Sequence, residues 1–381
     1  MPIYKAIQIS IITLFYYTAI QAQSAVIKEK QLSQEKMQQL YDEIKTPFKY
    51  GLAVVPVADD KKLDCPSVFR KGNKWYMSYI VFDGKGYETW LAESDDLLSW
   101  KTKGKLLSFS ADTIRWDANQ KAGYIALQNP EWGGSYAWEK YQGKYWMSYF
   151  GGNTKGYEAG DLSIGIANTK NDPATPHEWN RIDQPVLTAK DKDVRWWENR
   201  KLFKSTVIRD PKKLTGHEFV MYYNANGDSA KNNIKTRWYE RIGMAVSDDM
   251  LNWKRFHTEP VVHHPAGITG DAVIQKMGDT YVMFYFGAFW TDRKGGFNRF
   301  AASKDLVNWT DWNGENLIES SRPYDEVFAH KSFVVKYRGI VYHYYCAVNK
   351  AGQRGIALAT SKDLGASELN FVTAERKSNA Q

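Results

Sequence analysis

The chain has 381 residues, 43% of them apolar and 25% charged, so it is long enough to bury one large core or two modest ones. Its net charge of +8 comes from basic residues scattered among acidic ones, without a long Lys/Arg block, which argues against a nucleic-acid partner. With only two cysteines, Cys65 and Cys346, the chain is not a disulfide scaffold, and we interpret both as small buried side chains.

The first 22 residues are typical of a secretion signal. Lys5 supplies a positive charge, residues 7–20 form an apolar run, and Ala22 offers a small residue for cleavage. The run is too short and too interrupted to span a membrane, and no other stretch of the chain predicts a span. We therefore expect a bacterial protein that is secreted or periplasmic.

Residues 23–50 predict a short N-terminal helical segment ahead of the main domain. Ser33 is a candidate helix cap, and three apolar residues follow at helical spacing, Met37, Leu40 and Ile44. We expect this helix to pack on the main domain or to mediate a homodimer.

Between residues 51 and 370 the chain repeats one plan five times. Each copy has a short strand, a turn that usually carries glycine, and a strand rich in Tyr, Trp and Met; the copies begin near Asp64, Ser135, Asn199, Gly270 and Ala329. A third strand of small residues follows, and several copies then end in a Ser-x-Asp-x-x-x-Trp pattern, as in "SDDLLSW" and "SDDMLNW". Five such units, each of roughly 60 to 70 residues, predict an all-β fold, a five-bladed β-propeller. Residues 371–381 form a polar tail.

Ionisable residues stand at the heads of the predicted first strands. In a propeller these strands line the central axis, so their heads meet at one mouth although they lie far apart in the sequence. The head residues are Asp64, Glu131, Glu198 with Arg200 and Lys201, Asp271, and His330 with Lys331. Ionisable side chains are costly to bury without a partner, so we expect them to form a shared axial pocket.

A ring of carboxylates suits glycoside hydrolysis. That reaction needs an acid that protonates the leaving oxygen and a second carboxylate that activates water or acts as nucleophile. Asp64 is the best candidate base, because Pro66 restricts the backbone beside it. The alternative for Asp64 is a strand cap or an Asx-turn.

The Asp-Cys-Pro opening, the "NKWY" and "GKYW" hairpins, the Ser-x-Asp endings and the final "RGIALATS" resemble the five-bladed propeller glycoside hydrolases, including families 43, 62, 32, 68, 117 and 130. The resemblance covers about residues 50–368 and implies that Asp64 is the general base of an inverting enzyme. A family 43-like pattern would make Glu198 the acid. A family 117-like pattern, that of the 3,6-anhydrogalactosidases, would instead combine Asp64 with Asp271 and His330.

His330 is the second candidate acid. Its ordinary pKa lies near neutrality, and a neighbouring carboxylate such as Asp271 would raise it. Two alternatives stay open: a ligand of a single divalent cation on the axis, such as calcium, or a structural residue. No metal ligand is assigned, and no other cofactor is expected.

Further residues are candidates for sugar binding. Aromatic faces suit sugar rings, although Trp also fills β cores. The candidate platforms are Trp132, Trp197 and Trp290, and the polar candidates are Glu131, Arg200, Lys201, Arg237 and Lys331.

The sequence therefore predicts a secreted glycoside hydrolase, exo-acting and inverting, that releases a terminal sugar from a plant or algal poly- or oligosaccharide. Arabinofuranosidase, galactosidase and 3,6-anhydrogalactosidase activities fit equally. One alternative is a family 130-type glycoside phosphorylase, with Lys331 holding phosphate. Another is a non-catalytic propeller that binds glycans.

Overall fold

The computed structural model describes residues 31–58, 60–227 and 239–371. The predicted secretion signal, and the predicted polar tail after residue 371, lie outside the described residues. Within the described ranges the chain forms twenty strands, one α-helix and one turn of 3-10 helix, so the fold is almost entirely β, as the repeats predict. No helix in these ranges is long and apolar enough to cross a membrane.

The described strands pair into five antiparallel groups of four. The first group is β2 (Lys62–Lys71), β3 (Lys74–Phe82), β4 (Tyr87–Ser94) and β5 (Lys101–Leu107). The second is β6 (Gln120–Ala126), β7 (Tyr145–Gly152), β8 (Ser163–Thr169) and β9 (Asn180–Arg181). The third, after η1 (Trp196–Glu198), is β10 (Lys201–Arg209), β11 (Phe219–Asn226), β12 (Glu240–Ser247) and β13 (Lys254–Phe256).

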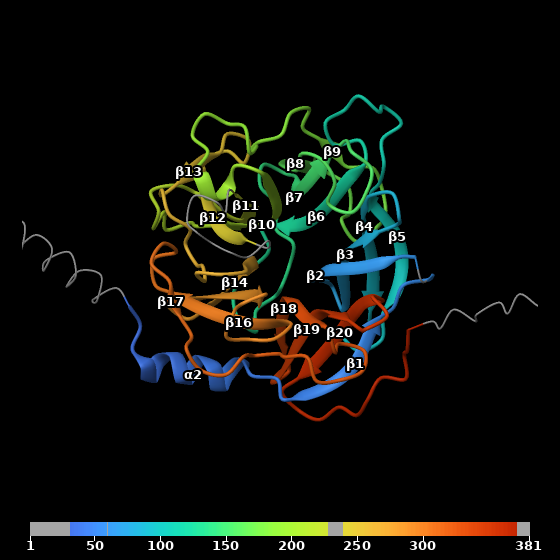
Figure 1. Ribbon diagram of the computed structural model, residues 1–381, viewed down its shortest axis with the longest axis vertical. Coiled ribbons are helices and arrows are strands. Elements are labelled where there is room, and N and C mark those ends of the chain that lie inside the picture. The colour runs from blue at the N-terminus through green and yellow to red at the C-terminus, as the bar shows by residue number, and fades with distance from the viewer. Residues whose placement is uncertain (1–30, 59, 228–238, 372–381) are drawn as a thin grey trace, which may run out of the picture.

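The last two groups follow the same order, with one exception. The fourth is β14 (Ile268–Met277), β15 (Thr280–Ala288), β16 (Gly296–Ser303) and β17 (Thr310–Asp311). The fifth is β18 (Phe328–Tyr337), β19 (Ile340–Val348) and β20 (Arg354–Thr360), completed by β1 (Phe48–Val54) from the other end of the chain. The groups stand round a common centre, with the first strands β2, β6, β10, β14 and β18 facing inward (Figure 1).

The repeated Ser-x-Asp ending is a turn that closes the third strand. The Ser94 hydroxyl accepts the backbone N–H groups of Asp96 and Leu97, at 3.2 and 2.9 Å. The Asp96 carboxylate in turn accepts two further backbone N–H groups, and Leu97 adopts a positive φ of 67°. The third and fourth groups repeat this turn, so the motif marks one structural position in successive groups.

The N-terminal helix α2 (Gln34–Ile44) begins at its predicted cap, since the Ser33 hydroxyl accepts the Lys36 N–H group at 3.2 Å. Its apolar face, Met37, Leu40 and Ile44, is buried in the core shared with the first, fourth and fifth groups. The helix thus packs on its own chain beside β17 (Figure 1), and this face is not available to a second copy. The homodimer through this helix stays a prediction without structural support.

Strand β1 closes the ring, which the sequence analysis did not foresee. Residues 48–54 run antiparallel to β20, from Phe48 opposite Thr360 to Val54 opposite Ile356. This pairing covers an edge of β20 that would otherwise expose unpaired backbone groups. The Lys49 ammonium also binds the buried carboxylate of Asp325, which accepts the Tyr345 hydroxyl at 2.8 Å.

Replacement of Lys49 by methionine tests the contribution of this closing contact. Because Asp325 would stay buried without its cation, we expect the free energy of unfolding to fall by about 2 to 4 kcal/mol, measured by urea denaturation. The matched control is Lys45→Met, which removes an exposed ion pair with Asp42 and is expected to change stability by less than about 1 kcal/mol. Equal effects of the two substitutions would contradict a special role for the closing contact.

Candidate active site

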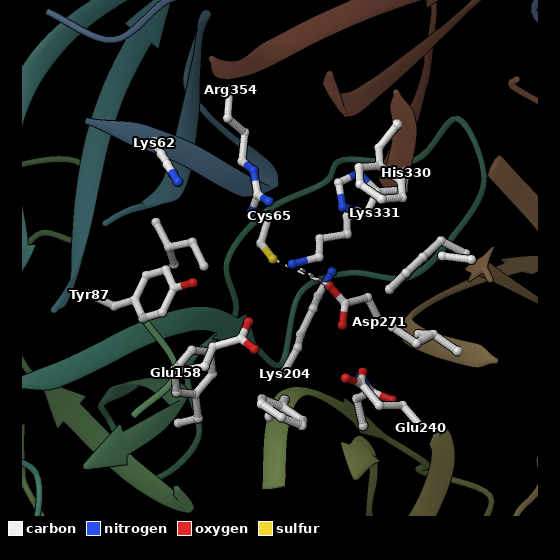
Figure 2. A pocket seen from close by; sticks show the side chains of 18 of the residues that line it. Lys62, Cys65, Tyr87, Glu158, Lys204, Glu240, Asp271, His330, Lys331 and Arg354 are labelled. Atoms are coloured by element: carbon white, nitrogen blue, oxygen red, sulfur yellow. Dashed lines mark hydrogen bonds and ion pairs between the residues drawn. The ribbon is translucent and has the colours of Figure 1, made fainter. Parts of the chain in front are cut away.

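A cavity of about 300 Å³ lies at one end of the ring. Every first strand contributes to its wall, through Cys65, Tyr124, Lys204, Asp271 and Lys331 (Figure 2). The predicted convergence of the strand heads therefore does occur. This volume is at the lower end of the range for small-molecule sites, and it suits a single sugar ring rather than an open polymer.

Backbone irregularities aim several of these side chains. Strands β2, β14 and β18 each carry a bulge at the same place, and each bulge begins with a non-glycine residue in the left-handed conformation: Cys65 (φ 46°), Asp271 (φ 57°) and Lys331 (φ 62°). Bulges redirect side chains, and left-handed non-glycine residues are strained, so both features are enriched at functional sites. By this register Asp64 is equivalent to His330, whereas Asp271 is equivalent to Cys65 and Lys331.

Asp64 lies behind the cavity wall with all its hydrogen-bonding capacity in use. It is 1% exposed; its Oδ1 accepts the Cys65 N–H group at 3.0 Å, and its Oδ2 accepts both Lys331 Nζ and Arg354 Nη1 at 2.8 Å. Burial alone would raise the pKa of this carboxyl, but the two cations outweigh burial and hold it well below its usual range. Asp64 is therefore a permanent carboxylate that positions Lys331 and Arg354, an arrangement that does not favour the predicted role of base.

His330 also differs from its expected role. Its Nδ1 lies 3.2 Å from the Cys346 carbonyl oxygen, and its ring packs between Phe286 and Phe328. Burial lowers the pKa of His330 to about 3, and Lys331 adds to this effect against the attraction of Asp64. The imidazole is neutral near pH 7, so the expectation that a carboxylate would keep it protonated is wrong.

Two glutamates that the sequence analysis did not select face the cavity. Glu240 begins β12, and Glu158 lies in the loop after β7 (Figure 2). Burial, and then the like charge of Glu158, raise the pKa of Glu240 to about 8. Burial also raises the pKa of Glu158, although Lys331 and Arg354 oppose that shift. Two carboxyl groups with raised and mutually coupled pKa values thus share one cavity.

Neighbouring groups hold the Glu158 loop in place. Arg354 Nη1 donates to the Tyr157 hydroxyl at 2.9 Å, and Lys201 Nζ donates to the Glu158 carbonyl at 2.5 Å. Lys201, predicted to bind substrate, therefore acts on this loop from the rim. The adjacent Arg200 is exposed, and its backbone N–H donates to the Asn226 carbonyl at 3.0 Å.

The structure does bring together Asp64, Asp271, His330 and Lys331, four of the predicted site residues. Lys331 Nζ lies 4.0 Å from Asp271 Oδ2, which also accepts the Cys65 thiol at 3.3 Å. Because Lys331 is bound to Asp64, it is not a free phosphate-binding cation. Both cysteines are free and buried, as predicted.

Glu198 and Trp197 belong to the core of the third group and do not line the cavity. Glu198 is fully buried, with its Oε1 2.6 Å from Arg195 Nε and 2.8 Å from Arg255 Nε, and it also accepts the Tyr223 hydroxyl at 2.5 Å. These partners occupy both carboxylate oxygens, so Glu198 is not placed to act as an acid. Trp197 is fully buried and donates its indole N–H to the Thr258 carbonyl at 2.9 Å.

The remaining predicted contacts also lie away from the cavity. Glu131 binds Lys276 Nζ at 2.5 Å, and the Trp132 indole binds Glu43 of α2 at 2.8 Å. Lys276 is five residues beyond Asp271 along β14, roughly 16 Å at the rise of a strand, so this pair lies near the other end of the ring. Trp290 supports the wall from behind, because its indole donates to the Ile268 carbonyl at 2.7 Å.

Arg237 lies outside the described residues, so its predicted contact with substrate stays a prediction.

One signal in the sequence could have revealed Glu240 and Arg354. Each begins the third strand of its group and pairs, parallel, with the start of a neighbouring group's first strand: Glu240 with Ile268, and Arg354 with Lys62. The heads of the third strands therefore reach the same end of the ring as those of the first strands. Glu158 lies in an irregular loop, where no repeat points to it.

The described residues include one cluster that resembles a metal site. The donor atoms of Asp64, His330 and Cys346 lie within 4.8 Å of one another. Calcium prefers six to eight oxygen ligands, whereas this cluster offers an imidazole, a thiol and one carboxylate. Lys331 and Arg354 already neutralise that carboxylate and would repel a divalent cation, so the cluster does not fit calcium.

Comparison with solved structures found two relatives with the same figures: 53% identity, a TM-score of 0.87, and coverage of 91% of this chain and 100% of the other. One is described as "Glycoside hydrolase", and the other as a complex of BT0996 with RGII. Zg3597, a family 117 glycoside hydrolase from the marine bacterium Zobellia galactanivorans, has a TM-score of 0.58 at 16% identity, over 84% of this chain and 91% of that one. At that identity the similarity shows the fold alone. No protein-family model and no curated protein matched the chain.

The predicted resemblance to the propeller glycoside hydrolases is thereby confirmed. A thermostable family 43 enzyme also shares the fold, with a TM-score of 0.55 at 16% identity over 84% of this chain and 97% of that one. A relative that is 53% identical over nearly the whole chain shows the family directly. The chain belongs to the glycoside hydrolases of the propeller superfamily.

Proposed function

We propose that this protein is an exo-acting glycoside hydrolase built on a five-bladed propeller, in which Glu240 is the general acid and Glu158 the second catalytic carboxylate. The observation that carries the proposal is the presence of both glutamates, each with a raised pKa, in one small cavity. The five antiparallel groups of four strands support the blade number. The small volume of the cavity supports removal of one terminal sugar.

The environment separates the roles of the two glutamates. Glu240 has a pKa of about 8, so it carries its proton at neutral pH and is able to protonate the leaving oxygen. Lys331 and Arg354 favour the ionised form of Glu158, which leaves Glu158 able to activate a water molecule. This division of one proton between two carboxyl groups is the usual means by which such a pair supplies both acid and base at one pH.

Asp64 supports this chemistry without touching the sugar. Its carboxylate holds Lys331 and Arg354 against the cavity, and Arg354 also binds Tyr157, the residue before Glu158. We therefore transfer the predicted role of base from Asp64 to Glu158. Single displacement with inversion, which the sequence analysis predicted, stays part of the proposal.

The substrate proposal rests on the similarity to BT0996. The structure of that protein is described as a complex with RGII, and the two proteins are 53% identical. We infer that this protein acts on an oligosaccharide of the same kind. Arabinofuranosides, galactosides and 3,6-anhydrogalactosides form the panel of terminal sugars to test. The predicted secretion signal supports action outside the cytoplasm, in the periplasm or the medium.

Matched glutamate-to-glutamine variants test the catalytic pair. Glu240→Gln is expected to lower kcat on an RGII oligosaccharide roughly 100- to 10,000-fold, because its amide cannot give a proton. The loss should be much smaller on a 4-nitrophenyl glycoside, whose leaving group departs without protonation. Glu158→Gln should lower kcat on both substrates. The control is Glu198→Gln, which is expected to reduce stability but to leave kcat per folded molecule near wild type; loss of activity in this variant alone would overturn the assignment.

The pH dependence follows from the same pKa values. We expect kcat/KM to fall about tenfold per pH unit above roughly pH 8, as Glu240 loses its proton. At the acid side the rate should fall where Glu158 becomes protonated. Initial rates measured from pH 4 to 10 check both limbs, and a rate that stays constant through pH 10 would exclude Glu240 as the acid.

The stereochemistry of the product tests the displacement. Proton NMR of the first sugar released should show the anomer opposite to that of the substrate, because Glu158 is proposed to activate water. A product that retains the configuration would instead make Glu158 a nucleophile. The same reaction run with and without phosphate separates hydrolysis from phosphorolysis.

A further inference from the structure

Lys204 presents a buried ammonium group to the cavity without a hydrogen-bond acceptor among the described residues. The side chain is 2% exposed and lines the cavity beside Cys65, Asp271 and Lys331 (Figure 2). Its Nζ lies near the Tyr124 ring, 5.6 Å from the ring centroid. A buried ammonium without an acceptor is costly, and a protein keeps one where a ligand supplies the acceptor.

An unused acceptor accompanies this donor. Asn224 is 3% exposed and also lines the cavity; its Nδ2 donates to Glu240 Oε2 at 2.6 Å, but its Oδ1 has no partner in the described part of the chain. The two residues come from one bulge, since Leu202 pairs with Ala225 and Ser205 with Tyr223, which leaves Phe203 and Lys204 opposite Asn224. A donor and an acceptor are thus both left unsatisfied at the same point of the wall.

This pair matches the chemistry of an alcohol. A hydroxyl oxygen accepts one hydrogen bond while its hydrogen is donated to another group, so a single hydroxyl would satisfy both Lys204 and Asn224. A ligand carboxylate would satisfy only the lysine, and it would enter a cavity that already holds Glu158, Glu240 and Asp271. An uncharged sugar hydroxyl is the better fit.

We propose that Lys204 and Asn224 bind one hydroxyl group of the terminal sugar and so determine which sugar the enzyme accepts. The inference rests on the proposed function, and it names a feature of the substrate at the same site. Because Asn224 also holds Glu240, the bound hydroxyl sets the orientation of the amide that positions the acid. The correct sugar therefore improves kcat as well as KM.

The test compares Lys204→Met with wild type on a parent glycoside and on a series of its monodeoxy analogues. A site built for a hydroxyl discriminates strongly against its loss. Wild type should lose roughly 10- to 100-fold in kcat/KM on one analogue, whereas Lys204→Met should lose a similar factor on the parent and then show little discrimination against that analogue. The control is Lys212→Met, at an exposed position in the turn after β10, which should match wild type on every substrate.

The stability of the empty protein gives a second readout. Removal of an unpaired buried charge should leave the Tm of Lys204→Met unchanged or raised, while the protection that an RGII oligosaccharide gives against thermal unfolding should fall. A lower Tm, together with equal losses on the parent and all analogues, would mean that Lys204 is structural and would overturn the proposal. If Lys204→Met does not fold, Lys204→Gln carries the same comparison.

Other outcomes separate this inference from the proposed function. Unchanged discrimination in Lys204→Met overturns the hydroxyl site but leaves the catalytic pair in place. A wild-type preference for uronides that Lys204→Met abolishes would show that the ligand is a carboxylate, which also overturns the proposal. If Glu158→Gln and Glu240→Gln stay active, the proposed mechanism fails, while thermal protection by the oligosaccharide still decides the role of Lys204.

Discussion

One buried carboxylate and two cations hold the centre of this protein together. Asp64 of the first group accepts Lys331 and Arg354 of the last group, at 2.8 Å each. The three side chains lie where burial is severe, so removal of the anion would leave two uncompensated charges, a far larger penalty than the pair's own contribution to stability. The contact therefore joins the ends of the ring at the axis, while β1 joins them at the outer edge.

The same cluster shapes the acidity of the cavity. Its two cations oppose the rise in pKa of Glu158, whereas burial and the charge of Glu158 keep Glu240 protonated. Arg354 adds a mechanical link, because it binds Tyr157 next to Glu158. A residue that never touches the sugar can thus decide which of the two carboxyl groups holds the proton.

The repeat supplies one backbone device and the chain uses it for different chemistry each time. Bulges at equivalent points of β2, β14 and β18 turn a thiol, a carboxylate and an ammonium into the same cavity. The related bulge of β10 places Lys204 opposite Asn224. A nearly symmetrical scaffold in this way produces an asymmetrical pocket, which a sugar with distinct hydroxyl groups requires.

The sequence by itself determined the all-β fold, the repeated groups and the end of the ring at which the site lies. These follow from local patterns: alternation along strands, the Ser-x-Asp turn, and ionisable residues at strand heads. The helix cap at Ser33 and the buried free cysteines were predictable for the same reason. Only the tertiary structure decided which ionisable residues are paired. Whether a carboxyl group is neutralised, as Asp64 and Glu198 are, or left with a raised pKa, as Glu240 is, depends on residues tens to hundreds of positions away. No spacing along the chain records those neighbours, because folding brings them together.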